Sequence, residues 1–373
     1  MPVVTRLKEL GWTVITGGKD PKGPAHRLAD EYLSFDYSEP DEVIDAARRA
    51  MASCLIPSGH DKAVFPAAIA AKELGLPGHD APNSARTLHR KDLLKKQLRQ
   101  VGISSPQNFG RAEAIDFLGG GGRLIVKPAD LAGGRGISEV TTSPELESAL
   151  AYSEKVSGDS SFVIEEFIEG TNHGVSLMVA DGQSRIIFAD NEYYGLNKFR
   201  VAGAHSKSDL TADHLSSINS WMQSLVKDMR LVDGLLHLQV ILQGNQVQVI
   251  EVMRRIPGDG YPLLPEVASG VKFIDIFLGG YLGEKFIDEF PRIPTRNVIR
   301  HVVGAQAEGR FRGIALSPET SEFLIHSCIW AKTGEQVFDK MTWSAGALYF
   351  SCSDNDFSSL LSSVRTTAAS VER

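Results

Sequence analysis

The sequence predicts an α/β protein in which an open parallel-sheet domain at the N-terminus is followed by a larger α+β part with a small mobile lid. Short apolar segments alternate with amphipathic helical segments over about the first 85 residues. This alternation is typical of a parallel sheet. Further along, a strand that carries a lysine runs into a glycine-rich loop, and an apolar β-hairpin follows much later.

Composition and charge exclude several classes of protein. Of the 373 residues, 42% are hydrophobic and 23% are charged, as in ordinary folded domains. The net charge of −7 argues against a general nucleic-acid or anionic-membrane binder, although a single site can still be locally basic. The sequence shows neither a leader nor an apolar run of about 18 residues. The 3 cysteines form no paired motif, so we expect a cytoplasmic protein without disulfides or zinc.

The N-terminal region reads as alternating helices and strands. Helical spacing is found at 3–10, 40–51 and 63–74, and short strands are expected at 13–16 and 54–57. Open α/β domains usually begin with a strand, whereas a helix comes first here. The sequence leaves open whether that first strand is missing.

A basic stretch and a denser block of strands follow. Residues 86–101 have the spacing of a basic helix, for which a solvated amphipathic face is one reading. Strands are expected at 123–128, 137–140 and 162–168. A helix should open at 143, where proline stands in its first turn. These elements surround the glycine-rich loop.

The glycine-rich loop suggests contact with phosphate. Gly133-Gly134-Arg135-Gly136 lets backbone N–H groups approach phosphate oxygens closely, although such turns also connect strands without any ligand. The GxxxxGK[ST] motif is absent, so the loop is not a P-loop. Lys127 strengthens the interpretation, because a lysine within an apolar strand needs an anionic partner.

A predicted hairpin around Gly244-Asn245 carries candidate metal ligands. Gln239 and Glu251 lie on its two strands, twelve positions apart, where a short hairpin can bring them together. Oxygen ligands of this kind suit Mg²⁺ that bridges nucleotide phosphates. The alternative is an edge strand with a hydrated polar face. Arg255 follows closely and suits a phosphate or a substrate carboxylate.

In this order, the motifs resemble those of the ATP-grasp superfamily. The resemblance is to the branch of biotin carboxylase, the purine-pathway carboxylate ligases and the L-amino-acid ligases, and it covers about residues 10–280. It implies an ADP-forming carboxylate–amine ligase that uses ATP and Mg²⁺. Its partners would be a small-molecule carboxylate and amine, with a homodimer also possible.

The resemblance also assigns roles to residues. Arg255 would steady the acyl-phosphate, and Gln239 and Glu251 would bind one or two Mg²⁺ ions. Lysines and the glycine loop would hold the phosphates, the hinge strand would meet the adenine, and His173 would contact the ribose. The implied ATP contacts are Lys91, Lys127, Gly133, Gly134, Arg135, Gly136, Glu165, Glu166, Ile168 and His173.

Two positions depart from the family pattern. Gln239 stands where glutamate is common, and Met253 stands where asparagine is common. A thioether is a poor Mg²⁺ ligand, so a second metal site is weakened. Gln239→Glu is expected to raise the Mg²⁺ affinity. These departures support the alternative of a non-catalytic nucleotide-binding protein.

The resemblance divides the chain into three parts and leaves the substrate open. The parts are a pre-grasp domain at 1–85, a central and lid part at 86–170, and a C-terminal subdomain at 171–373. An amino acid or peptide is the first hypothesis for the substrate, and a purine-pathway carboxylate is the second. Residues 258–262 occupy the place of a substrate loop.

Overall fold

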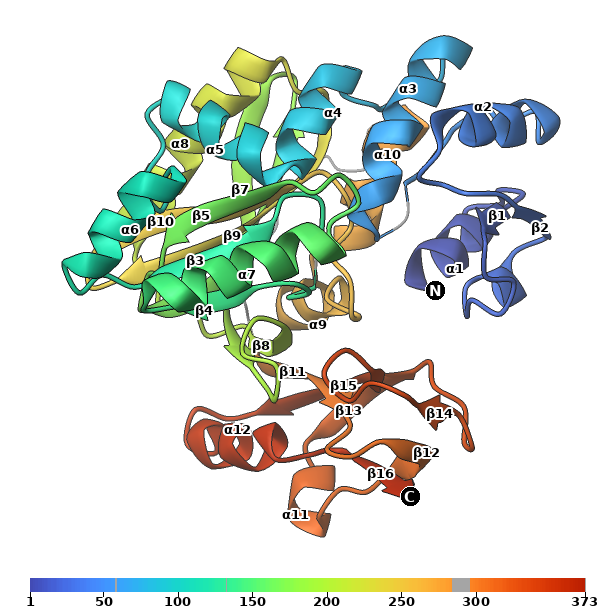
Figure 1. Cartoon of the computed structure of the whole chain (residues 1–373). Helices are drawn as coiled ribbons and strands as arrows, with labels where there is room; N and C mark the ends of the chain where they lie inside the picture. The colour runs from blue at the N-terminus through green and yellow to red at the C-terminus, as the bar shows by residue number, and fades with distance from the viewer. Residues whose placement is uncertain (58, 132, 284–295, 373) are drawn as a thin grey trace.

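The computed structural model describes residues 1–57, 59–131, 133–283 and 296–372 (Figure 1). The predicted α/β class is confirmed. A small N-terminal parallel sheet, a three-stranded antiparallel sheet and a large antiparallel sheet follow one another along the chain, and the C-terminal segment builds a further small sheet. In Figure 1 the C-terminal elements, in orange and red, lie in the lower part of the molecule, and the large sheet extends into that part.

The N-terminal part contains the expected alternation. Strand β1 (Ile15–Gly18) pairs in parallel with β2 (Glu31–Ser34). Helix α1 (Pro2–Glu9) precedes them, and α2 (Pro40–Arg49) and α3 (Val64–Leu74) follow and pack together. The predicted helices of this region are therefore confirmed within one or two residues at each end.

The strand predicted at 54–57 is wrong. These residues have no strand partner in the part of the chain that the structure describes, and the carbonyl of Leu55 is instead 2.7 Å from Nε2 of His79. The parallel sheet consequently has two strands. The three cysteines are free thiols, as predicted.

The basic stretch forms two helices rather than one. Helix α4 (Pro82–His89) ends before Arg90, whose backbone is extended, and α5 (Lys91–Gln100) begins immediately after it. The break turns Leu94 and Leu98 into the core under the large sheet. It also places the first residue of α5 beside the glycine loop, because Lys91 N–H donates to the carbonyl of Ala129.

The small sheet has the strand order β4-β3-β5 and is antiparallel. Two helices pack with it around a separate apolar core. Its members are α6 (Arg111–Gly119), β3 (Leu124–Pro128), β4 (Ser138–Val140), α7 (Ser143–Val156) and β5 (Phe162–Glu166). This unit corresponds to the expected lid.

The large sheet has eight strands in the order β10-β9-β6-β7-β8-β11-β15-β13, with antiparallel neighbours. One face packs on α5 and α8 (Ala212–Met229), and the other packs partly on α9 (Leu263–Ser269) and α10 (Phe273–Leu282). Its strands are β6 (Thr171–Ala180), β7 (Gln183–Tyr194), β8 (Val201–His205), β9 (Gly234–Gln243), β10 (Gln246–Met253), β11 (Asn297–Gly304), β13 (Leu324–Ile329) and β15 (Ser344–Cys352).

The C-terminal part contains short strands and two helices. Strand β12 pairs with β14 and β16, and α12 packs over a core that β11 and β15 share. The elements are β12 (Gly309–Ile314), α11 (Pro318–Ser321), β14 (Gln336–Val337), α12 (Phe357–Arg365) and β16 (Ala369–Glu372).

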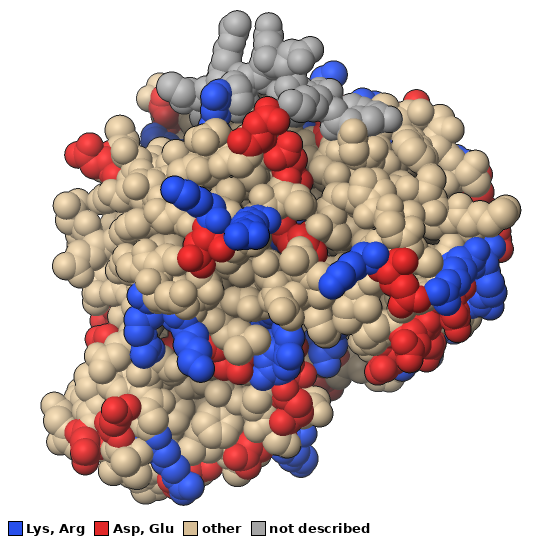
Figure 2. Space-filling model, turned by 90° about the horizontal axis from the view of Figure 1, so that it is seen from above, with Lys and Arg blue, Asp and Glu red and all other residues tan. Residues whose placement is uncertain are grey.

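The surface shown in Figure 2 carries both signs of charge. Lysine and arginine side chains are interspersed with aspartate and glutamate across this face. Among the helices of the described residues, none is both long and apolar enough to cross a bilayer.

Candidate functional site

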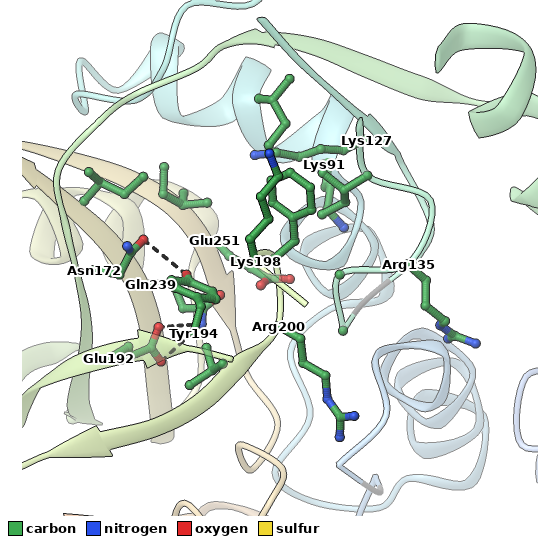
Figure 3. A pocket seen from close by; sticks show the side chains of 18 of the residues that line it. Lys91, Lys127, Arg135, Asn172, Glu192, Tyr194, Lys198, Arg200, Gln239 and Glu251 are labelled. Atoms are coloured by element: carbon green, nitrogen blue, oxygen red, sulfur yellow. Dashed lines mark hydrogen bonds between the residues drawn. The ribbon is translucent and has the colours of Figure 1, made fainter. Parts of the chain in front are cut away.

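A cavity of about 900 Å³ lies where the small sheet, the large sheet and the N-terminal part meet. Figure 3 shows basic side chains entering it from several elements. The residues expected to bind nucleotide or metal that line the cavity are Lys91, Lys127, Gly133, Gly134, Arg135, Glu165, Glu166, Ile168, Gln239, Glu251 and Arg255. The fold thus brings together residues from positions 91 to 255, whereas Gly136 and His173 do not line the cavity.

Lys127 has the anionic partner that its strand position demands. Its Nζ donates to Oε2 of Glu165 at 2.8 Å, and Lys95 Nζ is 3.5 Å from Oε1 of the same carboxylate. Burial favours the neutral acid, but the two ammonium groups hold the pKa of Glu165 below its usual range. Burial lowers the pKa of Lys95 to about 8. Two lysines around one carboxylate leave net positive charge for an incoming anion.

Lys95 was not predicted as a site residue. It lies four positions after Lys91 on α5 and is almost fully buried. Its Nζ also donates to the carbonyl of Val249 at 3.3 Å, so it links Glu165 on β5 to the hairpin of β9 and β10. The spacing of one helical turn from Lys91 is the signal that could have identified it.

The glycine loop contacts neighbouring segments at two points, Leu131 and Gly134. Lys91 Nζ donates to the carbonyl of Leu131. Gly134 has φ +74, and a Cβ there would lie 2.7 Å from the carbonyl oxygen of Phe199, so only glycine fits. Gly136 has φ +73, and a Cβ there would clash with Pro128 rather than reach the cavity. Gly133 and Gly134 therefore line the cavity, whereas Gly136 does not.

The expected pairing across the hairpin is confirmed. Glu251 lies directly opposite Gln239, because the register shifts by one residue between Val249 and Glu251. This bulge lets Ile250 and Glu251 both reach the cavity wall. Among the described residues, the carboxylate of Glu251 has no hydrogen-bond or salt-bridge partner, whereas Gln239 Nε2 donates to both carboxylate oxygens of Glu192, at 3.2 and 2.9 Å.

These donors fit Mg²⁺ that also binds phosphate. The described residues contain no group of three or more His, Cys, Asp or Glu side chains placed to hold a metal. Glu251 and Gln239 offer one carboxylate and one amide oxygen on the cavity wall. Mg²⁺ commonly takes one or two protein oxygens and fills its octahedron with water and phosphate oxygens.

Arg255 is held by a residue of the N-terminal part that the sequence did not single out. Its Nε and Nη2 donate to the two oxygens of Asp61 at 2.6 and 3.0 Å, and His89 Nδ1 lies 3.3 Å from the same carboxylate. Burial alone would lower the pKa of Arg255, but Asp61 raises it above the usual value. The guanidinium is fixed at the cavity, with part of its charge neutralised.

A second acidic group lies beside the hairpin. Burial raises the pKa of Asp190 to about 7 and that of Glu192 to about 8. Tyr261 Oη donates to Asp190 Oδ2 at 2.5 Å. Glu192 and Tyr261 line the cavity, as do the nearby Arg300 and Asp259. Acidic residues at two alternate positions of an apolar strand were the sequence signal for this group.

The expected ribose contact at His173 does not match its position. His173 is fully buried, is 2.7 Å from Thr171 Oγ1 through Nε2, and lies opposite Val240, which packs under α8. Successive side chains of a strand face opposite sides of a sheet. Asn172 therefore lines the cavity instead, where it accepts from Tyr194 Oη at 3.1 Å.

Lid closure is a testable property of this cavity. Glu139 on β4 pairs with Lys198 across from the glycine loop, so the small sheet contacts the segment at 197–200. We expect amide hydrogen exchange over about residues 119–160 to slow when an ATP analogue is added, because a bound nucleotide holds such lids closed. Equal exchange with and without the analogue would argue for a rigid lid.

Comparison with known proteins relates this site to one domain family. Residues 89–259 match the ATP-grasp domain. The large chain of carbamoyl phosphate synthase from Synechocystis sp. is 24% identical over 187 residues, which are 47% of this chain. The matched part spans only 17% of that relative's length.

Solved structures agree with the fold. An L-amino acid ligase from Bacillus licheniformis is similar with a TM-score of 0.79 and 17% identity, covering 100% of this chain and 95% of that one. A second similar structure is the biotin carboxylase domain dimer of the 2-oxoglutarate carboxylase from Hydrogenobacter thermophilus, solved with MgADP, ADP and bicarbonate. Its TM-score is 0.78 and its sequence identity is 15%, covering 99% of this chain and 88% of that one.

Proposed function

Because residues 89–259 match the ATP-grasp domain, we propose that this chain is an ATP-dependent, ADP-forming ligase that joins a carboxylate to an amine. The observation that supports this most strongly is the gathering of Lys127, the glycine loop and Glu251 on one cavity. The proposal includes the division into 1–85, 86–170 and 171–373, with ATP bound between the second and third parts.

The proposed reaction has two steps. A substrate carboxylate oxygen attacks the γ-phosphorus of ATP, and ADP leaves. The amine nitrogen then attacks the acyl carbon and loses a proton, and phosphate leaves with one of the original carboxylate oxygens. Mg²⁺ would offset charge on the phosphates when it is bound.

The chain's own residues would bind and orient the reactants. Lys91 and Lys127 would neutralise phosphate charge, and the tip of the glycine loop would offer backbone N–H groups. Glu251 and Gln239 would hold the metal, as the MgADP in the biotin carboxylase domain suggests. Arg255 would stabilise the charge that develops during transfer. Closure of the lid would exclude water that competes with the amine.

For the substrate, we propose an amino acid or a peptide-like carboxylate and amine, as the name of the L-amino acid ligase suggests. The test is ADP and phosphate release with pairs of L-amino acids. Release that requires both members of a pair supports the proposal. Tight ATP binding without release by any carboxylate and amine pair would favour a non-catalytic nucleotide-binding protein. A homodimer stays a prediction, for which light scattering is the measurement.

Nucleotide binding is expected to depend on Lys127. Lys127→Ala should weaken ADP binding by about 1.5–3 kcal/mol, the value of a hydrogen bond to a charged group. It should also reduce the gain in thermal stability that ADP gives. Lys155→Ala, at an exposed position of α7, is the matched control. Unaltered affinity in Lys127→Ala would remove the basis of the proposed site.

A further inference from the structure

The contact between Gln239 and Glu192 joins strands that are not neighbours. Gln239 lies on β9 and Glu192 on β7, with β6 between them. Adjacent strands are about 4.8 Å apart, so the two backbones are about 10 Å apart. The two long side chains nevertheless meet, as Figure 3 shows, with Nε2 of Gln239 at 2.9 and 3.2 Å from the carboxylate oxygens.

The strand between them carries a glycine opposite Gln239. Gly174 on β6 is the direct partner of Gln239 on one side and of Asp190 on the other. A Cβ at this position would come within 2.7 Å of a carboxylate oxygen of Asp190. The Asp190 carboxylate therefore lies over Gly174, in the space that a side chain there would occupy.

We propose that Glu192 is a positioning residue that turns the carbonyl oxygen of Gln239 toward the metal. This inference rests on the proposed Mg²⁺ site. An amide has one donor end and one acceptor end, and in this structure the donor end of Gln239 faces the two oxygens of Glu192. Because Glu192 takes the NH₂ group, Oε1 of Gln239 is directed away from it and is free to ligate a cation. Outer partners of this kind commonly orient metal ligands.

The same contact reverses an expectation from the sequence. Gln239→Glu was expected to raise Mg²⁺ affinity by supplying a charged ligand. With Glu192 in place, the new side chain would face another acidic side chain and would have no NH₂ group to donate to it, so the hydrogen bonds that orient residue 239 would be lost. The gain in Mg²⁺ affinity from Gln239→Glu should therefore appear only when Glu192 is replaced by a residue that can donate a hydrogen bond.

The test is a four-variant cycle that measures metal binding rather than turnover. The wild type, Glu192→Gln, Gln239→Glu and the double variant are titrated with ADP by calorimetry at increasing Mg²⁺. The quantity compared is the Mg²⁺ concentration that gives half of the rise in ADP affinity. Glu154→Gln, at an exposed position of α7, is the matched control. Thermal unfolding confirms that each variant folds.

We expect Glu192→Gln to raise the required Mg²⁺ about tenfold, as loss of an outer partner does elsewhere. Gln239→Glu alone should not lower it. The double variant, in which the new amide donates to the new carboxylate, should return it to the wild-type value or below. If Glu192 had a merely structural role, Gln239→Glu would change the required Mg²⁺ concentration in the same direction whether residue 192 is Glu or Gln. If Glu192→Gln folds poorly, the required Mg²⁺ concentration of Gln239→Glu is compared with that of the double variant, and a lower value in the double variant still supports the positioning role.

Two results would count against the proposal. If Gln239→Glu lowers the required Mg²⁺ equally with Glu192 or Gln at position 192, the two residues act independently and the positioning role is wrong. A wild type that binds ADP with no response to Mg²⁺ would instead contradict the metal site of the proposed function, and the inference with it.

Discussion

Glu251→Gln is expected to abolish ADP formation while nucleotide still binds in the absence of Mg²⁺. Glu251 is the one metal-ligating carboxylate that we assign, and its oxygens have no competing hydrogen bond or salt bridge among the described residues. An amide keeps the shape but loses the charge that Mg²⁺ prefers in a ligand. Steady-state ADP release and calorimetry with ADP in EDTA measure the two effects.

The control for Glu251→Gln is Glu154→Gln, which should leave both measurements unchanged. Retention of wild-type ADP formation in Glu251→Gln would show that the metal is held elsewhere. Loss of ADP binding even in EDTA would show that the side chain contacts the nucleotide directly. Either outcome would contradict the role assigned to Glu251.

Arg255→Ala is expected to lower turnover by about 10²–10³, as the removal of one electrostatic stabiliser of a transition state does in other enzymes. ADP affinity should change little, because Arg255 is proposed to face the transferring group. The measurements are kcat for ADP release and calorimetric ADP affinity.

Asp61 complicates this variant, because it would lose its bidentate partner and remain as a buried charge beside His89. Leaving one member of a buried ion pair is destabilising. Arg255→Ala combined with Asp61→Asn separates the two effects, since the amide needs no cation. The combined variant should recover thermal stability but not turnover. Recovery of turnover would show that Arg255 acts through folding and not on the reactants.

Much of the site followed from local sequence pattern. Lys127 in an apolar strand indicated an anionic partner, for which the sequence suggested phosphate; in the structure its partner is Glu165, which had been assigned to the hinge strand. The hairpin spacing predicted the pairing of Gln239 with Glu251, although the bulge that sets the register was not foreseen. Such features depend on residues close in the chain or on two adjoining strands, where periodicity carries the information.

The features that were missed depend on contacts between distant segments. Asp61 reaches Arg255 across 194 positions, and Lys95 reaches Val249 across 154. No spacing rule links such residues. His173 was assigned to the ribose through the family resemblance, but a strand alternates its faces, so a shift of one position moves the side chain to the other side of the sheet. Asn172 occupies the cavity face.

Isotope transfer from the substrate tests the central claim most directly. The carboxylate of a substrate amino acid is labelled with ¹⁸O, and the phosphate released in the presence of ATP and the amine is analysed by mass spectrometry. Activation as an acyl-phosphate predicts that each phosphate carries one ¹⁸O atom and that ADP, not AMP, accumulates. Phosphate without the label would show that water attacks ATP, and AMP with pyrophosphate would show adenylation; either result would contradict an ADP-forming carboxylate–amine ligase.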